Sequence, residues 1–193
     1  MKILCVSDYH REKKFAKSVE KLAEKEKADV IINAGDYISM DFARKILDKT
    51  KFRTFTIHGN WDTDIKTSNN KVTILRNQAV EYRGYYFLGV DWGFYSYIME
   101  LSKGIDPKKL ILITHDPPYD ILDLSYFGGN AGHLDLRAIV NELKPALHVF
   151  GHIHESAGYI EDKDTIFVNA ALPEFEKAVM VELPERKIKV FDI

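Results

Sequence analysis

The first 57 residues alternate short apolar runs with longer amphipathic segments, and this alternation limits the chain to very few folds. Residues 2–6, 29–32 and 53–57 are apolar runs of strand length. Between them, residues 11–27 and 40–49 carry apolar side chains at helical spacing, so each predicted helix has one face to bury. Strands that are joined by helical crossovers run parallel within one sheet. The sequence therefore predicts a β-α-β-α-β unit.

The rest of the chain predicts a second set of strands. Residues 72–75, 80–82 and 85–90 are closely spaced strand candidates, and Arg83-Gly84 lies where a hairpin turn is needed. Later candidates are strands at residues 110–114 and 147–150, a helix at residues 136–143, and a C-terminal β-meander at residues 165–168, 178–183 and 187–191. We expect an α/β fold in which a two-sheet β-sandwich is flanked by helices, with residues 1–193 forming a single domain.

The composition argues against several classes of protein. Hydrophobic residues make up 46% of the chain, which is too many for an intrinsically disordered protein. A formal net charge of -2 argues against a protein that holds nucleic acid by bulk positive charge. The apolar runs are too short to span a bilayer, the N-terminus lacks a signal-peptide core, and Cys5 has no disulfide partner. We therefore expect a soluble cytoplasmic protein.

The side chains that carry chemistry lie directly after the predicted strands. Five strand ends deliver candidate metal ligands, namely Asp8, His10, Asp36, Asn60, His115, His152 and His154. Parallel strands place their carboxyl ends along one edge of a sheet, so we expect these side chains to converge. Imidazole, carboxylate and amide groups without cysteine suit borderline-to-hard divalent metals. Scattered capping and turn residues are the alternative interpretation, but it does not explain four histidines in matched positions.

Three glycines support the metal-site prediction through the backbone conformations that they allow. Gly35, Gly59 and Gly151 each precede a candidate ligand by one residue, where the chain leaves a strand. Such a position needs either a freely chosen φ or room for a close backbone approach. If Asp36 bridges two metals, each metal has four protein ligands, and positions stay open for water and substrate.

The blocks follow a recognisable order: Asp-x-His at residues 8–10, Gly-Asp at 35–36, Gly-Asn-x-Asp at 59–62, His115, and Gly-His-x-His at 151–154. This order resembles that of the calcineurin-like metallophosphoesterases. The short chain and the sequence His115-Asp116-Pro117-Pro118 look most like the small single-domain prokaryotic phosphoesterases of that superfamily. The resemblance implies a four-layer α/β/β/α metallophosphoesterase fold.

The resemblance also implies how the ligands divide between two divalent metals. One metal would be held by Asp8, His10, Asp36 and His154. The second would be held by Asp36, Asn60, His115 and His152. The implied reaction is hydrolysis of phosphodiesters, or alternatively phosphomonoesters, by attack of a metal-bridging hydroxide on phosphorus. Manganese is the metal we expect, and iron, zinc or nickel would also accept these ligands.

One position departs from the family pattern. Many members have a general-acid His directly after the Asn of the Gly-Asn block, whereas this chain has Trp61. Asp62 is kept, and His58 lies two residues before Asn60, from where it could reach the site. We take Asn60, Asp62 and His58 as the catalytic candidates. We expect either a preference for acidic leaving groups or the use of another acid.

Two further histidines each have competing interpretations. His133 follows a glycine-rich stretch at residues 128–132, which we expect to be a loop beside the site. Together with Asn60 it is a candidate for binding the substrate phosphate, and the alternative is a simple helix-entry residue. His148 lies inside a predicted strand, which favours a core position over a ligand role.

The leading function is a dinuclear metal-dependent phosphoesterase that acts on a small phosphoester. The alternative is a non-catalytic scaffold that uses the same fold to bind protein, but the intact set of candidate ligands favours catalysis. A DNA-repair type of nuclease is disfavoured, because the chain has neither the extra length nor a basic composition. We expect no obligate nucleic-acid partner and no membrane partner, and a homo-oligomer is compatible with the sequence.

Overall fold

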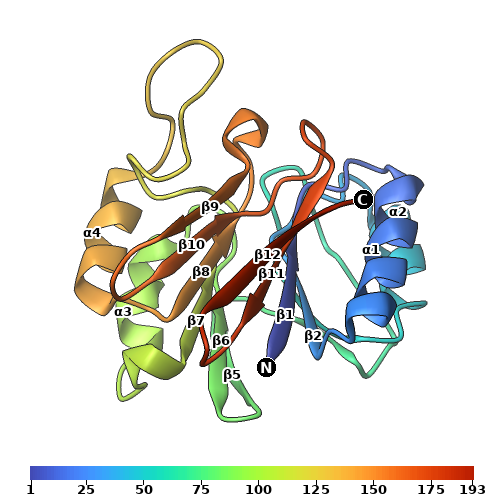
Figure 1. Ribbon diagram of the computed structural model, residues 1–193, viewed down its shortest axis with the longest axis horizontal. Helices are drawn as coiled ribbons and strands as arrows, with labels where there is room; N and C mark the ends of the chain where they lie inside the picture. Colours follow the sequence, from blue (N-terminus) through green and yellow to red (C-terminus); the bar gives the residue numbers. More distant parts are fainter.

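Two six-stranded sheets pack face to face between two layers of helices in the computed structural model, which describes residues 1–193 (Figure 1). The strand order is β12-β11-β1-β2-β3-β4 in the first sheet and β5-β6-β7-β8-β10-β9 in the second. Helices α1 and α2 cover the outer face of the first sheet, and α3 and α4 cover that of the second. This arrangement confirms the predicted α/β sandwich.

The first sheet contains the predicted parallel unit. Its strands are β1 (Lys2–Val6), β2 (Val30–Asn33), β3 (Arg53–Thr56), β4 (Val72–Ile74), β11 (Lys177–Glu182) and β12 (Lys187–Asp192). Strands β1 to β4 run parallel, and β11 pairs antiparallel with β1. The crossover helices are α1 (Lys13–Glu26) and α2 (Met40–Leu47). The Ser39 side chain caps α2 by accepting a hydrogen bond from the Phe42 amide at 3.4 Å.

The second sheet has a parallel centre and antiparallel edges. Its strands are β5 (Gln78–Tyr82), β6 (Tyr85–Gly89), β7 (Leu110–Ile113), β8 (Leu147–Phe150), β9 (Gly158–Glu161) and β10 (Ile166–Asn169). Strands β6, β7, β8 and β10 run parallel, whereas β5 and β9 are antiparallel edges. The helical segments here are α3 (Ile98–Leu101), α4 (Leu134–Leu143) and the 3-10 turns η1 (Tyr95–Tyr97), η2 (Pro107–Lys109) and η3 (His154–Ser156).

The predicted C-terminal β-meander is wrong in one respect. Strand β10 lies in the second sheet, parallel to β8, while β11 and β12 form a hairpin in the first sheet. All four residues of β10 are buried, which requires a central position with cover on both faces. The edge strand β9, which the sequence analysis did not predict, protects its other side.

The fold places the candidate residues at one edge of the sandwich. A core of 20 buried residues fills the space between the two sheets. The parallel strands of both sheets end at the upper edge in Figure 1, where the long connecting loops lie. No helix of the chain combines the length and the apolar character that crossing a membrane requires.

Candidate metal centre

The seven candidate ligands converge at this edge, and several of them have an unusual backbone conformation. Asp8, His10, Asp36 and His152 have φ angles of 58°, 44°, 59° and 70°. A positive φ is uncommon for residues other than glycine, and it collects at functional sites where the surrounding fold can enforce it. These values turn the chain sharply as it leaves β1, β2 and β8, so that the side chains point back over the strand ends.

The glycines are needed mainly for close approach. Gly35 has a φ of 103° and lies directly against the backbone of Gly59. A Cβ atom on Gly59 would clash with the Asp36 carboxylate, and one on Gly151 would clash with the Asp8 carboxylate. The two carboxylates therefore occupy the space that these glycines leave open.

The first ligand group is built around Asp8. Its Oδ2 accepts a hydrogen bond from the His152 amide at 3.1 Å, which leaves Oδ1 facing the other candidates. That Oδ1 lies 3.3 Å from His154 Nε2 and 3.7 Å from His10 Nε2. The buried His10 Nε2 has no hydrogen-bond partner, although it also lies 3.5 Å from Asp36 Oδ2. An unpartnered ring nitrogen between two carboxylates fits a metal ligand.

The second ligand group is built around Asn60. Its Oδ1 lies 2.9 Å from His115 Nε2 and 3.3 Å from both Asp36 Oδ2 and His152 Nδ1. His115 Nδ1 lies 2.8 Å from the Ala34 carbonyl oxygen, to which it donates, so Nε2 is the nitrogen that a metal could displace a proton from and bind. Four side-chain nitrogen and oxygen atoms thus face one point, and each can act as a metal ligand once the imidazoles are neutral. This donor set fits a divalent cation.

The charges of the two groups reinforce one another. Burial alone would lower the pKa of His115, but the hydrogen bond to Asp36 and the charges of Asp8 and Asp36 raise it to about 9. Contacts with Asp36 and Asp8 raise the pKa of His10 to about 9 as well. Burial acts to raise the pKa of Asp36, but the close contacts with the His10 and His115 rings outweigh it and hold that pKa at about 2. The two carboxylates therefore stabilise positive charge between the two ligand groups.

A buried carboxylate behind the ligands, Asp116, had no assigned role in the sequence analysis. Its Oδ1 lies 3.7 Å from His152 Nε2, on the side of the ring opposite the Asn60 oxygen. The Tyr95 hydroxyl donates a hydrogen bond to its Oδ2. A carboxylate behind a ligating imidazole orients the ring and fixes its tautomer. The sequence signal was the position of Asp116 directly after His115 at a strand end.

The Asp62 carboxylate holds two loops together through hydrogen bonds to their backbone amides. It accepts hydrogen bonds from the amides of Asp36, Tyr37, Ile38 and Gly59 at 2.8, 2.9, 2.9 and 3.1 Å. One side chain therefore ties the loop after β2 to the loop after β3. Asp62 positions Asp36 by this means, and its carboxylate forms no hydrogen bond or ion pair with the side chains of the candidate ligands.

His58 is held away from the ligand groups. Its Nε2 accepts from the Ile65 amide at 3.0 Å, and its Nδ1 lies 3.1 Å from Asp91 Oδ1. The Arg76 guanidinium also lies 3.0 Å from Nε2. Because Nε2 is the acceptor, the ring proton belongs to Nδ1 and points to Asp91. This geometry disfavours His58 as the proton donor that replaces the missing acid.

His133 lies beside the site, at the start of α4. Its Nε2 lies 3.0 Å from Asp116 Oδ2, and its ring centroid lies 5.0 Å from that of Tyr95. Its side chain is 47% exposed. His148, by contrast, is fully buried, with Nε2 2.9 Å from Thr114 Oγ1, as the core interpretation requires.

The comparison with protein families identifies the class of protein. The family model described as "Calcineurin-like phosphoesterase superfamily domain" matches residues 1–175. The chain belongs to this superfamily of metal-dependent phosphoesterases, which confirms the resemblance inferred from the five motif blocks.

Relatives with related names share part or most of the chain. A UPF0046 protein of Caenorhabditis elegans is 27% identical over 210 residues, which cover 89% of this chain and 69% of that protein. Metallophosphoesterase domain-containing protein 1 of Homo sapiens is 34% identical over 111 residues, or 51% of this chain. The matched part of the chain spans only 34% of the human protein's length.

Solved structures show the same fold at low sequence identity. TT1561 of Thermus thermophilus superposes with a TM-score of 0.74 at 14% identity, covering 99% of this chain and 98% of that one. A structure described as a novel archaeal phosphodiesterase gives 0.67 at 16% identity, with 100% of both chains covered. A dimetal phosphatase from Danio rerio gives 0.59 at 9% identity, covering 100% of this chain and 98% of that one. These similarities support the fold alone.

Proposed function

We propose that the chain is a dinuclear metal phosphoesterase whose preferred substrates are phosphodiesters. The observation that carries the proposal is the position of Asp36 Oδ2, which lies 3.5 Å from His10 Nε2 and 3.4 Å from His115 Nε2. One carboxylate oxygen therefore faces both ligand groups, as a ligand shared by two cations must. Membership of the phosphoesterase superfamily supports the reaction class.

The residues of the site suit such a centre. When bound, two divalent cations would polarise the phosphoryl oxygens and supply a hydroxide nucleophile near neutral pH. Asp8 and Asp36 offset two of the four positive charges, so the loaded site keeps a charge of about +2 and attracts a phosphate group. Asn60 would hold a cation through its oxygen and donate from its amide nitrogen to a phosphoryl oxygen. Manganese is the metal that we propose for these nitrogen and oxygen ligands.

The hollow beside Asn60 favours a monoanionic diester over a dianionic monoester. It has a volume of 220 Å³ and includes Arg76 and Trp92 in its lining. The Arg76 guanidinium is paired with Asp64 at 2.7 Å, so that carboxylate offsets its charge. Trp92 is 49% exposed and offers an aromatic face to a second ester group.

We assign the missing proton donor to His133. The Asp116 carboxylate next to Nε2 holds the imidazole in the way that acid–base histidines are held in other enzymes. Because the same carboxylate also lies behind His152, His133 is adjacent to a candidate ligand. In this role the imidazolium keeps its Nε2–H on Asp116 and gives the Nδ1 proton to the departing alkoxide oxygen.

The test of the proposed function is turnover by purified protein loaded with manganese, iron, zinc or nickel. We expect metal-dependent hydrolysis of bis(p-nitrophenyl) phosphate, faster than that of p-nitrophenyl phosphate. Full metal loading without turnover of either ester would contradict the proposal and support the protein-binding scaffold instead.

The His133 assignment is tested with a leaving-group series. His133→Gln should lower kcat for alkyl leaving groups by about 10²-fold or more, since general-acid catalysis matters most there. For nitrophenyl leaving groups, which depart without a proton, the change should stay within about threefold. Equal losses for both ester types would contradict the assignment.

Four statements about the whole protein stay predictions. They are that residues 1–193 act as one domain, that the chain works in the cytoplasm, that it has no obligate nucleic-acid partner and no membrane partner, and that it is compatible with a homo-oligomer.

A further inference from the structure

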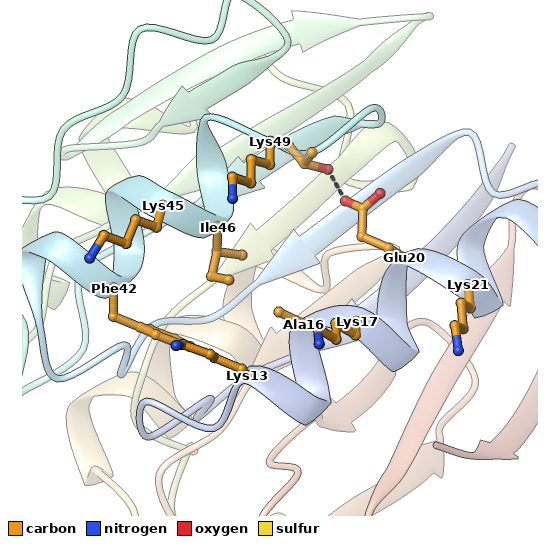
Figure 2. Close-up of a pocket in the computed structure, with 10 residues that line it drawn as sticks. Lys13, Ala16, Lys17, Glu20, Lys21, Phe42, Lys45, Ile46 and Lys49 are labelled. Atoms are coloured by element: carbon orange, nitrogen blue, oxygen red, sulfur yellow. Dashed lines mark hydrogen bonds between the residues drawn. The ribbon is translucent and has the colours of Figure 1, made fainter.

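A groove of 460 Å³ runs between α1 and α2 on the outside of the first sheet (Figure 2). Its rim carries five exposed lysines from both sides, which are Lys13, Lys17, Lys21, Lys45 and Lys49. Its floor is formed by Ala16, Phe42 and Ile46. Glu20 is its one acidic residue, and its carboxylate accepts a hydrogen bond from the Thr50 hydroxyl, drawn as a dashed line in Figure 2.

The five lysines have no partner within the chain. None of their ammonium groups forms an ion pair, whereas the neighbouring Lys14, outside the groove, pairs with Glu176 at 2.5 Å. Lys13, Lys17 and Lys21 recur every four residues, which stacks like charges along one helix face. Such a row is unfavourable by itself and becomes favourable when an anion lies along it.

The groove begins near the candidate metal centre. Helix α1 starts at Lys13, shortly after His10, and α2 starts at Met40, shortly after Asp36. Arg11 links the two loops, because its guanidinium donates to the Ile38 carbonyl at 3.3 Å. From this edge the lysines of α1 continue at intervals of about 6 Å, given the helical rise of 1.5 Å per residue. The row of lysines therefore starts on the side of the groove nearer the strand ends.

We propose that this groove binds single-stranded nucleic acid and guides it to the metal centre as a phosphodiester substrate. The proposal deepens the proposed function and rests on it. A strand that carries one negative charge per nucleotide suits a row of separate ammonium groups with few acceptors between them. The whole-chain charge of -2 conceals this local excess of positive charge.

An acidic amphipathic peptide is the competing occupant, and the floor of the groove disfavours it. Such a helix binds by burying its apolar face in a hydrophobic groove. Ala16 and Phe42 are only 5% and 7% exposed and Ile46 is partly buried, so few apolar side chains of the floor itself are left to cover. The charged groups that the groove offers are five ammonium groups and the Glu20 carboxylate.

The binding test uses metal-free protein and a fluorescent 12-nucleotide oligothymidylate, followed by anisotropy. Lys17→Glu/Lys45→Glu removes one groove lysine from each helix, and Lys108→Glu/Lys109→Glu is the matched control on the remote turn η2. Each Lys→Glu change subtracts two charges, so both double variants go from -2 to -6. The groove variant should bind at least tenfold more weakly, and the control should stay within about twofold. The slope of log K against log salt should become shallower by about 1.4, at 0.7 per lost phosphate contact.

The cleavage test compares the same oligonucleotide with bis(p-nitrophenyl) phosphate on manganese-loaded protein. In the groove variant, the ratio of kcat/KM for the oligonucleotide to that for the small ester should fall at least tenfold, and in the control it should not change. Four results would overturn the proposal: no oligonucleotide binding at low salt, equal losses in both variants, binding without cleavage, or a 12-residue polyglutamate that binds as tightly. Failure to hydrolyse the small ester would instead refute the proposed function, since the binding assay needs no turnover.

Discussion

The candidate metal centre has a buried half and a half-exposed half, and the fold fixes them differently. Asp8, Asp36 and His115 are buried, and each forms a hydrogen bond with the main chain. Asp8 accepts from the His152 amide, Asp36 accepts from the Trp61 amide, and His115 donates to the Ala34 carbonyl. The side chains of His10, His152 and His154 are 29%, 33% and 26% exposed. Their ring nitrogens meet mainly other side chains. The buried half is therefore positioned by the main chain, and the exposed half by its neighbours.

This difference predicts which ligands can be replaced. A buried carboxylate has no access to water, so removing its charge leaves the surrounding positive groups uncompensated. An exposed imidazole can be replaced by a water molecule at a smaller cost. Substitutions in the buried half should therefore have the larger effects.

The largest effect is expected at Asp36. Asp36→Asn should lower kcat/KM for bis(p-nitrophenyl) phosphate by at least about 10³-fold, because it removes the charge shared by both ligand groups. His154→Gln should lower it by about 10–100-fold. Metal content per chain, measured alongside by mass spectrometry, shows whether each loss follows from lost metal. Equal losses of kcat/KM in the two variants would contradict the proposed difference between the buried and the exposed ligands.

The next effect is expected at Asp116, which supports the exposed half. Asp116→Asn keeps the shape but removes the charge behind His152, so metal affinity should fall by about 10–100-fold. A titration of manganese with turnover as the readout measures this change. With bis(p-nitrophenyl) phosphate, activity at saturating manganese should recover to within about tenfold of wild type, and a larger residual loss would contradict this supporting role.

A smaller effect on activity is expected at Asp62, which supports the buried half. Asp62→Ala leaves four backbone amides without their acceptor, and the free energy of unfolding should fall by about 2–4 kcal/mol. Activity of the folded variant should fall by about tenfold. Denaturant unfolding of metal-free protein is the measurement. An unchanged stability with a far larger loss of activity would indicate that Asp62 acts on the substrate directly.

The smallest effect is a pH dependence of the metal-free protein. Folding raises the pKa of His10 and His115 to about 9, so their contribution to stability is full below about pH 6.5 and is lost as the pH rises through 9. The lowered pKa values of Asp8 and Asp36 contribute above about pH 4 and are lost in acid. His148, whose burial lowers its pKa to about 3, adds a loss as the pH falls below about 6.5.

Thermal unfolding between pH 7 and pH 9.5 measures the alkaline part of this dependence. The Tm of metal-free wild type should fall over this range, and that of His10→Gln should fall less. Manganese should flatten the curve, because the cation takes over the role of the protons. A Tm of metal-free wild type that rises over the same range would contradict the cited pKa shifts.

The convergence of the candidate ligands could be predicted from the sequence because it depends on local patterns. Strand ends, glycines and motif spacing placed Asp8, Asp36 and His152 at one edge of the sheets. It assigned no role to Asp116 and left the direction of the His58 side chain open, because both depend on which distant atoms lie next to them. The position of β10 was missed for the same reason, since strand pairing between remote segments leaves no local signal.

The groove between α1 and α2 shows a second limit of sequence reasoning. Opposite charges elsewhere cancel the lysines in any count over the whole chain. Only the packing of the two helices brings lysines from positions 13 to 49 around one hollow. Composition describes the average surface, whereas binding depends on where the charges gather.

The central claim is that one carboxylate, Asp36, joins two cation sites. Anomalous diffraction from crystals grown with manganese tests it most directly. We predict two peaks, one beside His10 and His154 and the other beside His115 and His152, with Asp36 between them. A single peak, or two peaks with Asp36 outside the coordination of either, would contradict the account.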